Sequence, residues 1–198
     1  LQLHLAPASG LNLVHLRMTE EFDTHGLFYF LGTDAGASAY KNPAMSGLVE
    51  VSHNEPEGEM CDGDYRNVTG REVSDLYSSD RGARWIAVHL GEGRHLVPSH
   101  YTLRHGFTTS AMLLRNFEFQ GSNDGVTWQV LRRHRNDYSM VISSVHGRYS
   151  ATYPVNTAQP FSHFRILQTG ANASGNHRLC LGGIELYGVL VLGHERSV

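Results

Sequence analysis

The sequence predicts an all-β chain folded as a jelly-roll β-sandwich, with about eight to nine strands and no long helix. Helical periodicity is nearly absent, and the apolar residues fall in short runs that alternate with polar residues or are rich in β-branched and aromatic side chains. Gly, Pro, Asn and Asp bound these runs, and 21 glycines supply turns. With 40% apolar and 18% charged residues, the chain can bury a core and is not typical of a disordered protein.

The first half of the chain contains four such runs. We expect strands at residues 27–31, 48–53, 84–90 and 96–105. The first, Leu27-Phe28-Tyr29-Phe30-Leu31, is apolar throughout and is expected to be a buried strand. In the third, strict alternation places Trp85, Ala87 and His89 on one face and Ile86, Val88 and Leu90 on the other.

The second half adds five predicted strands, at residues 116–122, 127–133, 147–153, 161–169 and 184–192. Between the first two of these, Asn123-Asp124-Gly125 supplies the positive φ angles that a tight hairpin turn needs. Trp128 follows the turn, and we expect it to be a large core residue of the next strand.

The runs show no repeat and no internal boundary, so we expect one domain. The predicted sandwich spans residues 20–190, with an N-terminal extension at 1–19 that packs on it and a tail at 191–198. A long loop insertion at 54–82 interrupts the strands, and residues 71–79 within it are the only candidate for a turn or two of helix. Because the sequence begins at Leu1 and not at Met, we expect a piece of a larger protein.

Four landmarks occur in a characteristic order. They are a tryptophan strand ending in Leu-Gly at 84–91, a Ser-Asn-Asp-Gly-Val-Thr-Trp hairpin at 122–128, an Arg-Ile strand at 161–166 and a Glu-Leu-Tyr-Gly end at 185–188. This series resembles the discoidin, or coagulation-factor type C, family, which implies a galactose-binding-like sandwich. His89 departs from that pattern, in which an acidic residue usually precedes Leu-Gly.

A closer resemblance covers residues 20–190. Residues 22–33, 101–106, 114–122 and 164–177 are similar to the intracellular discoidin-like domains of HECT-type ubiquitin ligases and BTB–BACK proteins. The resemblance includes loop residues, which packing alone does not dictate. It implies a non-catalytic protein-interaction module that recognises a substrate or partner. The alternative is an extracellular lectin-like discoidin domain that binds carbohydrate or lipid.

Two sequence features bear on the cellular compartment, and they disagree. Cys61 and Cys180 lie far apart, and neither is near a chain end that a bridge would join, so we interpret both as free thiols in a reducing compartment. This favours the cytoplasm or the nucleus. The glycosylation-like triplets that begin at Asn67 and Asn172 favour the outside of the cell.

Several other functions find little support in the composition. The 16 basic and 19 acidic residues give a formal charge of −3 with no basic patch, which argues against nucleic acid, and no apolar stretch is long enough to span a membrane. The 13 histidines lack the close spacing of a zinc site. A structural calcium ion in loops 33–36 or 61–64 is less favoured than carboxylates that cap turns, so we predict no cofactor.

No catalytic arrangement is evident. The adjacent pairs Ser52-His53 and Ser99-His100 fall in predicted strands, where neighbouring side chains face opposite ways and should not bond each other. Phosphate-binding, dinucleotide-binding and nucleophile-elbow motifs are absent from the sequence. We therefore expect a binding domain and not an enzyme.

The candidate contact residues lie in loops at the ends of strands. Loops at one end of a sandwich cluster in space, so segments distant in sequence can build one surface. The predicted binding residues are Tyr40, Asn42, Arg104, His105, Phe107, Arg115, Asn172 and His177. The alternative is that these polar side chains bond loop carbonyls and hold the turns in place.

Overall fold

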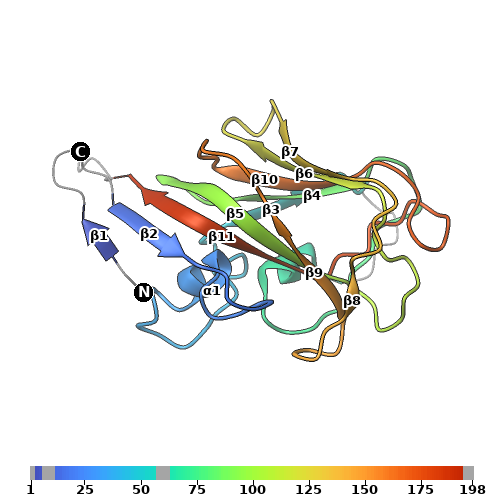
Figure 1. The fold of residues 1–198 in the computed structure, drawn as a ribbon, viewed down its shortest axis with the longest axis horizontal. Helices are drawn as coiled ribbons and strands as arrows, with labels where there is room; N and C mark the ends of the chain where they lie inside the picture. The colour runs from blue at the N-terminus through green and yellow to red at the C-terminus, as the bar shows by residue number, and fades with distance from the viewer. Residues whose placement is uncertain (1–2, 6–11, 57–62, 194–198) are drawn as a thin grey trace.

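The chain folds as two antiparallel sheets packed face to face, as the computed structural model shows for residues 3–5, 12–56 and 63–193. The six-stranded sheet has the order β1-β2-β11-β5-β9-β8, and the five-stranded sheet has the order β3-β4-β10-β6-β7. Figure 1 shows the two layers, with β6, β7 and β10 above β5 and β11. The predicted all-β sandwich is confirmed.

The strands of the six-stranded sheet are β1 (Leu3–Leu5), β2 (Asn12–Leu16), β5 (Arg94–Arg104), β8 (Val141–Ile142), β9 (Tyr149–Pro154) and β11 (Gly183–Leu192). Those of the five-stranded sheet are β3 (Glu50–His53), β4 (Trp85–His89), β6 (Phe117–Ser122), β7 (Gln129–His134) and β10 (His163–Gln168). Every strand predicted from residue 48 onward is present within a few residues of its expected bounds.

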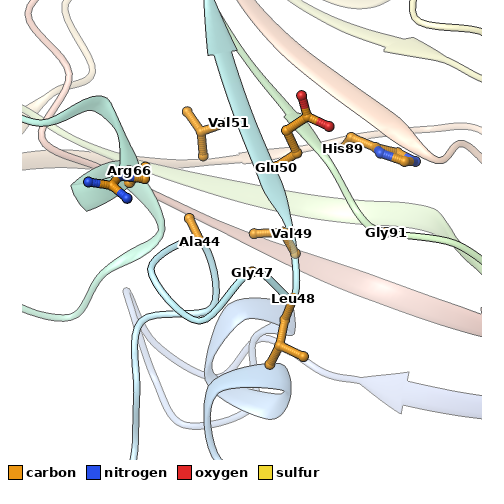
Figure 2. A pocket seen from close by; sticks show the side chains of 9 residues that line it. All are labelled: Ala44, Gly47, Leu48, Val49, Glu50, Val51, Arg66, His89 and Gly91. Carbon is orange, nitrogen blue, oxygen red and sulfur yellow. The ribbon is translucent and has the colours of Figure 1, made fainter.

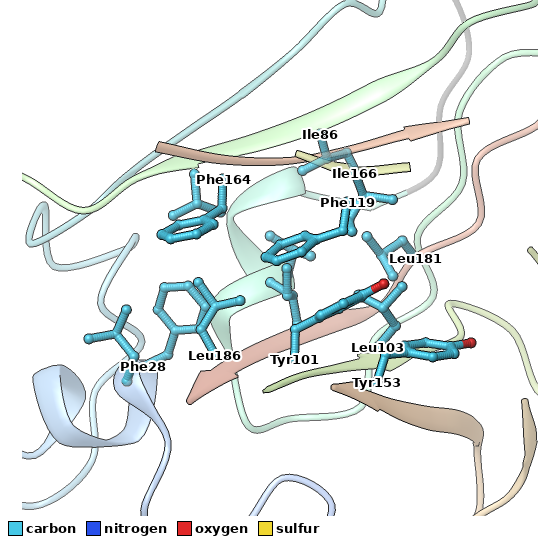
Figure 3. Close-up of a cluster of buried hydrophobic side chains, with 14 of the residues drawn as sticks. Phe28, Ile86, Tyr101, Leu103, Phe119, Tyr153, Phe164, Ile166, Leu181 and Leu186 are labelled. Atoms are coloured by element: carbon cyan, nitrogen blue, oxygen red, sulfur yellow. The ribbon is translucent and has the colours of Figure 1, made fainter. Parts of the chain in front are cut away.

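The core lies between the two sheets, where Figure 3 shows its aromatic centre. Tyr101 of β5 stacks on Phe119 of β6 with ring centroids 4.0 Å apart, and Phe164 of β10 stacks on the same Phe119 at 5.5 Å. The alternation predicted for β4 holds, because Ile86, Val88 and Leu90 are core residues.

Residues 27–31 form a helix, α1 (Leu27–Gly32), and not the expected strand. The helix needs no neighbouring strand, because local and side-chain acceptors satisfy its first N–H groups. The Phe30 N–H donates to the Gly26 carbonyl at 2.9 Å, and the N–H groups of Phe28 and Tyr29 donate to the Glu185 carboxylate at 2.8 and 3.3 Å. The apolar run fits either state, and this buried acceptor favours the helix.

Two further expectations are wrong in detail. Trp128 is not a core residue: it is half-buried on the outer face of the five-stranded sheet, where the Arg165 guanidinium lies 4.1 Å from the centre of its ring. The helical turn of the long loop is a 3₁₀ helix, η1 (Tyr65–Thr69), upstream of the predicted 71–79. The Asp64 side chain caps it by accepting from the Arg66 N–H.

Strand pairing also extends beyond the predicted sandwich at both ends. β2, within the expected extension, pairs with β11 from Leu16↔Gly188 to Asn12↔Leu192, so it belongs to the six-stranded sheet. Val14 and Leu16 of β2 are buried in the core. Gly188 of β11, opposite a bulge in β5, must be glycine, because its φ is +149° and a Cβ there would lie 2.0 Å from the Val97 carbonyl oxygen.

Candidate functional site

Strand register gathers several loops at one end of the sandwich. Arg104 at the end of β5 lies beside Gly183 at the start of β11, and Phe117 at the start of β6 lies beside Gln168 of β10. Loops 105–116, 135–148 and 169–182 therefore meet there, away from the chain termini (Figure 1). We call this the loop end. Of the predicted binding residues it carries Arg104, His105, Phe107, Arg115, Asn172 and His177.

Arg104 is buried and bonds main-chain carbonyls. Its guanidinium donates to the carbonyl oxygens of Gly70, Arg71, Glu72 and Gly182 at 2.8–3.2 Å. Burial, together with the nearby Arg71, lowers the pKa of Arg104 to about 10. Arg104 thus fastens the 70–72 segment to the end of the sandwich and offers little to a ligand.

His105 is fully buried beside Arg104. Its Nε2 lies 2.9 Å from the Ala111 carbonyl oxygen, and its Nδ1 lies 3.3 Å from that of Cys180. Burial lowers the pKa of His105. Cys180 is a free, buried thiol whose pKa burial raises to about 12, so it is not a reactive group. Cys61 lies outside the described residues.

Tyr40 and Asn42 lie against η1 and not in the loops of the loop end. The Tyr40 hydroxyl donates to the Thr69 carbonyl at 2.8 Å, and Asn42 Nδ2 donates to the Arg66 carbonyl at 3.0 Å. Asn42 Oδ1 also accepts from the Ala44 N–H and the Thr69 hydroxyl. Both side chains hold their own loop to η1.

The remaining predicted residues also make contacts within the domain. Arg115 donates to the Asp137 carbonyl at 2.8 Å, Phe107 packs edge-on against Tyr77, and the His177 N–H donates to Asp80. Asn172 is buried, and its side-chain amide donates to Asn176 Oδ1 at 2.6 Å and to the Arg178 carbonyl at 3.0 Å. A glycan on Asn172 is incompatible with this turn.

Four apolar side chains of the 135–148 loop and β8 are exposed at the loop end. They are Tyr138 (73% exposed), Val141 (62%), Ile142 (61%) and Val145 (59%). The Arg115 guanidinium lies 4.2 Å from the centre of the Tyr138 ring. The sequence predictions missed this apolar face, although the run from Tyr138 to Ile142 is apolar except for Ser139 and fits no predicted strand.

Two hollows open on the five-stranded sheet. The first, of about 350 Å³, is lined by Ala44, Gly47, Leu48, Val49, Glu50, Val51, Arg66, His89 and Gly91 (Figure 2). The second, of about 190 Å³, is lined by Trp85 and Trp128 among others and shares Glu50 and His89 with the first. His163 also lines it, and its ring stacks on His89 at 4.2 Å.

One of the two Ser–His pairs, Ser99-His100, departs from the sequence expectation. Ser99 Oγ lies 3.2 Å from His100 Nδ1, so these neighbours do bond each other. The reason is the bulge opposite Gly188: Tyr187 pairs with His100 and Gly188 with Pro98, which leaves Ser99 out of the alternation.

The described residues hold neither a metal-binding cluster nor a membrane-spanning helix. Residues 12–56 and 63–193 hold no group of three or more His, Cys, Asp or Glu side chains that could bind a metal ion. Across the same part of the chain, no helix has the length and apolar character to cross a bilayer.

No protein-family model matches the chain, but known proteins are similar to it in sequence. The chain is 37% identical over 182 residues to E3 ubiquitin-protein ligase Ufd4 of Drosophila melanogaster and 29% identical over 183 residues to E3 ubiquitin-protein ligase hecd-1 of Caenorhabditis elegans. It is 30% identical over 186 residues to a BTB/POZ domain-containing protein of Arabidopsis thaliana. These similarities cover 86%, 90% and 87% of this chain but only 6%, 7% and 22% of the relatives.

Solved structures share the fold at low sequence identity. CpGH89CBM32-5 from Clostridium perfringens has a TM-score of 0.54 at 12% identity, over 72% of this chain and 96% of its own. The F-lectin of striped bass, Morone saxatilis, has a TM-score of 0.55 at 16% identity, over 76% of this chain and 49% of its own. The chain thus has the galactose-binding-like β-sandwich fold, and most of its length is similar to a segment of two E3 ubiquitin-protein ligases and a BTB/POZ protein.

Proposed function

We propose that this chain is a non-catalytic protein-recognition domain of a larger intracellular protein, in which it selects a substrate or partner for ubiquitin ligation. The observation that carries the proposal is the similarity to two E3 ubiquitin-protein ligases, which covers most of this chain and a small part of each ligase. A domain of this size in a much longer chain is suited to binding while the chemistry takes place elsewhere.

The chemistry of the loop end supports a protein partner. The polar side chains expected to contact a ligand, Arg104 above all, donate their hydrogen bonds to loop carbonyls. The exposed side chains at this end include the apolar face of Tyr138, Val141, Ile142 and Val145. These four exposed apolar side chains fall within residues 138–145, and exposed apolar surface on a soluble domain is typical of protein interfaces.

The test places charge on that face. The purified chain and a Val141→Asp/Ile142→Asp double variant are used to capture proteins from cytosolic extract, and each captured protein is then purified and titrated directly. We expect the double variant to bind at least about tenfold more weakly, because a buried unpaired charge is costly at an interface. The matched control is Val126→Asp, since Val126 is 81% exposed in the hairpin at the opposite end of the sandwich.

Two results would argue against the proposal. If the double variant binds the captured protein as well as the wild type does, the apolar face is not the recognition surface. If the level of ubiquitylation of that protein in cells is unchanged when the domain is deleted from its parent protein, the domain does not select ligase substrates.

A carbohydrate is the second candidate ligand. The solved neighbours include a complex with GalNAc-β-1,3-galactose and one with galactose, and the smaller hollow has two half-exposed tryptophans among its walls. Titration with galactose and screening on a glycan array test this candidate, with Trp128→Ala expected to abolish any signal from the hollow. Absence of binding at millimolar sugar, together with a protein partner for the loop end, would reject it.

A further inference from the structure

Strand β3 is an edge of the five-stranded sheet. On one flank it pairs with β4, from Glu50↔His89 to His53↔Ile86, and no other strand of the described residues pairs with its second flank. An edge strand presents unpaired main-chain N–H and C=O groups that another chain can use. β3 therefore offers a short template for strand pairing.

The hydrogen bonds of β4 show which groups of β3 face this open flank. The Leu90 N–H donates to the Ser162 carbonyl at 2.9 Å and the Gln168 N–H donates to the Arg84 carbonyl at 2.8 Å, so the even-numbered positions from 84 to 90 bond β10. Because main-chain groups alternate along a strand, His89 and Ala87 face β3, where they pair with Glu50 and Ser52. The N–H and C=O of Val51, which lies between these two residues, therefore point away from β4.

The larger hollow lies beside these groups. Figure 2 shows Ala44 and Arg66 on one side of it and Val49 and Val51 of the β3 segment on the other. The hollow is bounded along the strand, because Pro43 occupies the flank of Val49 and the ring of His53 stacks on Tyr65 at 4.0 Å. The open edge is therefore short and centred on Val51.

We infer that an extended segment of a partner protein adds a strand to β3 at Val51, with an aliphatic side chain beside Val51 and a basic side chain beside Glu50. In paired strands, residues opposite one another point to the same face of the sheet. A guest residue opposite Val51 directs its side chain into the hollow with Ala44 and Val51. Its neighbour opposite Glu50 lies on the outer face.

The charges around the hollow favour a basic neighbour. Glu50 is exposed and belongs to no ion pair among the described residues, and it lines both hollows. Arg66, the cation across the hollow, is already paired with Asp64 at 2.7 Å, so it does not favour an acidic residue in the partner segment. Opposite charges directly across two paired strands stabilise the pairing, and like charges weaken it.

This inference rests on the proposal that the chain recognises proteins, and it adds a second site with its own ligand chemistry. The probe is the peptide acetyl-Ser-Thr-Lys-Val-Lys-Thr-Ser-amide, which is symmetric and so places a lysine opposite Glu50 whichever way it runs. Titration into the ¹⁵N-labelled chain should shift the amide signals of Val51 and Ser52 and slow hydrogen exchange of the Val51 N–H. Few hydrogen bonds are available, so we expect weak binding.

A charge exchange supplies the decisive comparison. Glu50→Lys should weaken binding of the lysine peptide about three- to tenfold, and a peptide with Glu-Val-Glu at its centre should bind Glu50→Lys better than it binds the wild type. The matched control is Glu92→Lys, which changes an exposed carboxylate in the turn after β4 and should leave both affinities nearly unchanged.

The inference is overturned if millimolar peptide leaves the Val51 and Ser52 signals unmoved, or if both peptides bind both proteins equally. Its failure is distinguishable from failure of the proposed function. If the peptide does not bind but Val141→Asp/Ile142→Asp still loses the captured partner, only the β3 site is rejected. If neither surface binds a protein, the recognition proposal is rejected as well.

Discussion

Arg104 illustrates how a polar residue at a loop can serve the fold and not a ligand. Its planar guanidinium carries five donors in a fixed fork, so one side chain can serve several carbonyls that arrive from different directions. Here the carbonyls come from Gly70, Arg71 and Glu72 in one loop and from Gly182 in another. Gly183 lies against the guanidinium, where a Cβ would be 3.0 Å from its atoms.

We predict that Arg104→Ala destabilises the domain by about 3 kcal/mol, because two buried and two partly buried carbonyls lose a charged donor at once. Arg104→Lys should recover only part of this, since an ammonium group cannot reach all four oxygens. Urea unfolding measures both variants, with Arg135→Ala as the control, because Arg135 is exposed in the turn after β7. A loss of partner binding by Arg104→Ala with unchanged stability would restore Arg104 as a contact residue.

At the scale of elements, helix α1 depends on a close approach between Gly26 and β11. The Glu185 carboxylate of β11 accepts from the N–H groups of Phe28 and Tyr29, and a Cβ on Gly26 would lie 2.2 Å from Glu185 Cδ. No side chain fits between the helix start and the carboxylate. The position is therefore restricted to glycine by contact and not by its φ angle, which is −77°.

Gly26→Ala should consequently cost about 2 kcal/mol or more, because either the helix start or the Glu185 side chain must shift. Gly82→Ala is the matched control: nothing lies within 4 Å of a Cβ there, and its stability should be unchanged or slightly higher. Thermal unfolding followed by circular dichroism compares the two. Equal melting temperatures for both variants would mean that α1 is not held to β11 as described.

The same helix shows why sequence patterns predict some elements and not others. Alternation predicts β4 because successive residues of a strand take opposite faces, and the burial of Ile86 and Val88 in the core confirms it. The run at 27–31 is apolar throughout, so it has no alternation that distinguishes a strand from a helix. The acceptor that favours a helix, Glu185, lies 157 residues from Phe28 in the sequence. β2 was missed for a related reason, since its partner is the far end of β11.

For the candidate site, the sequence predicts where loops gather but not how their side chains are used. Six of the eight predicted residues lie at the loop end. The bonding of Arg104 could not be predicted, because its acceptors are main-chain oxygens, which every residue carries. Trp128 shows the same limit: a tryptophan that heads a strand suits either face, and Arg165 and His163 define its outer position.

At the scale of the whole molecule, a hydrogen-bond network joins the two sheets. Tyr101 of the six-stranded sheet lies with its hydroxyl 2.6 Å from His134 Nε2 of the five-stranded sheet, and His134 Nδ1 lies 2.5 Å from Asp137 Oδ2. The His134 ring also stacks on Phe117 at 4.0 Å. A neutral imidazole satisfies both bonds, as donor to Asp137 and acceptor from Tyr101.

Tyr101→Phe should therefore cost about 1–2 kcal/mol, because it leaves a buried acceptor nitrogen without its donor while the aromatic packing stays. Tyr138→Phe is the control, since Tyr138 is 73% exposed and phenylalanine keeps its ring beneath Arg115. Urea unfolding at pH 7.5 measures both. A cost for Tyr101→Phe no greater than that of the control would show that the network does not join the sheets energetically.

The pH dependence of stability depends on two opposing sets of buried groups. Burial lowers the pKa of His105, His134 and His146, so the folded chain binds fewer protons there than the unfolded chain and loses stability as the pH falls below about 6.5. Burial raises the pKa of Glu185 from 4.5 to about 7. Glu185 therefore acts in the opposite sense: its contribution is complete below pH 4.5 and is lost as the pH rises to about 7.

Between pH 7.5 and 5.5 the two effects partly cancel in the wild-type chain, and Glu185→Gln removes one of them. The variant should be less stable than the wild type throughout, because an amide replaces one of the oxygens that accept from Phe28 and Tyr29. Its melting temperature should also fall more steeply as the pH drops, since only the histidine effect is left. Calorimetry of both proteins at half-unit pH steps measures the two slopes. A variant whose melting temperature falls no more steeply than that of the wild type would mean that the pKa of Glu185 is not raised, because the N–H groups of α1 keep it ionised in spite of its burial.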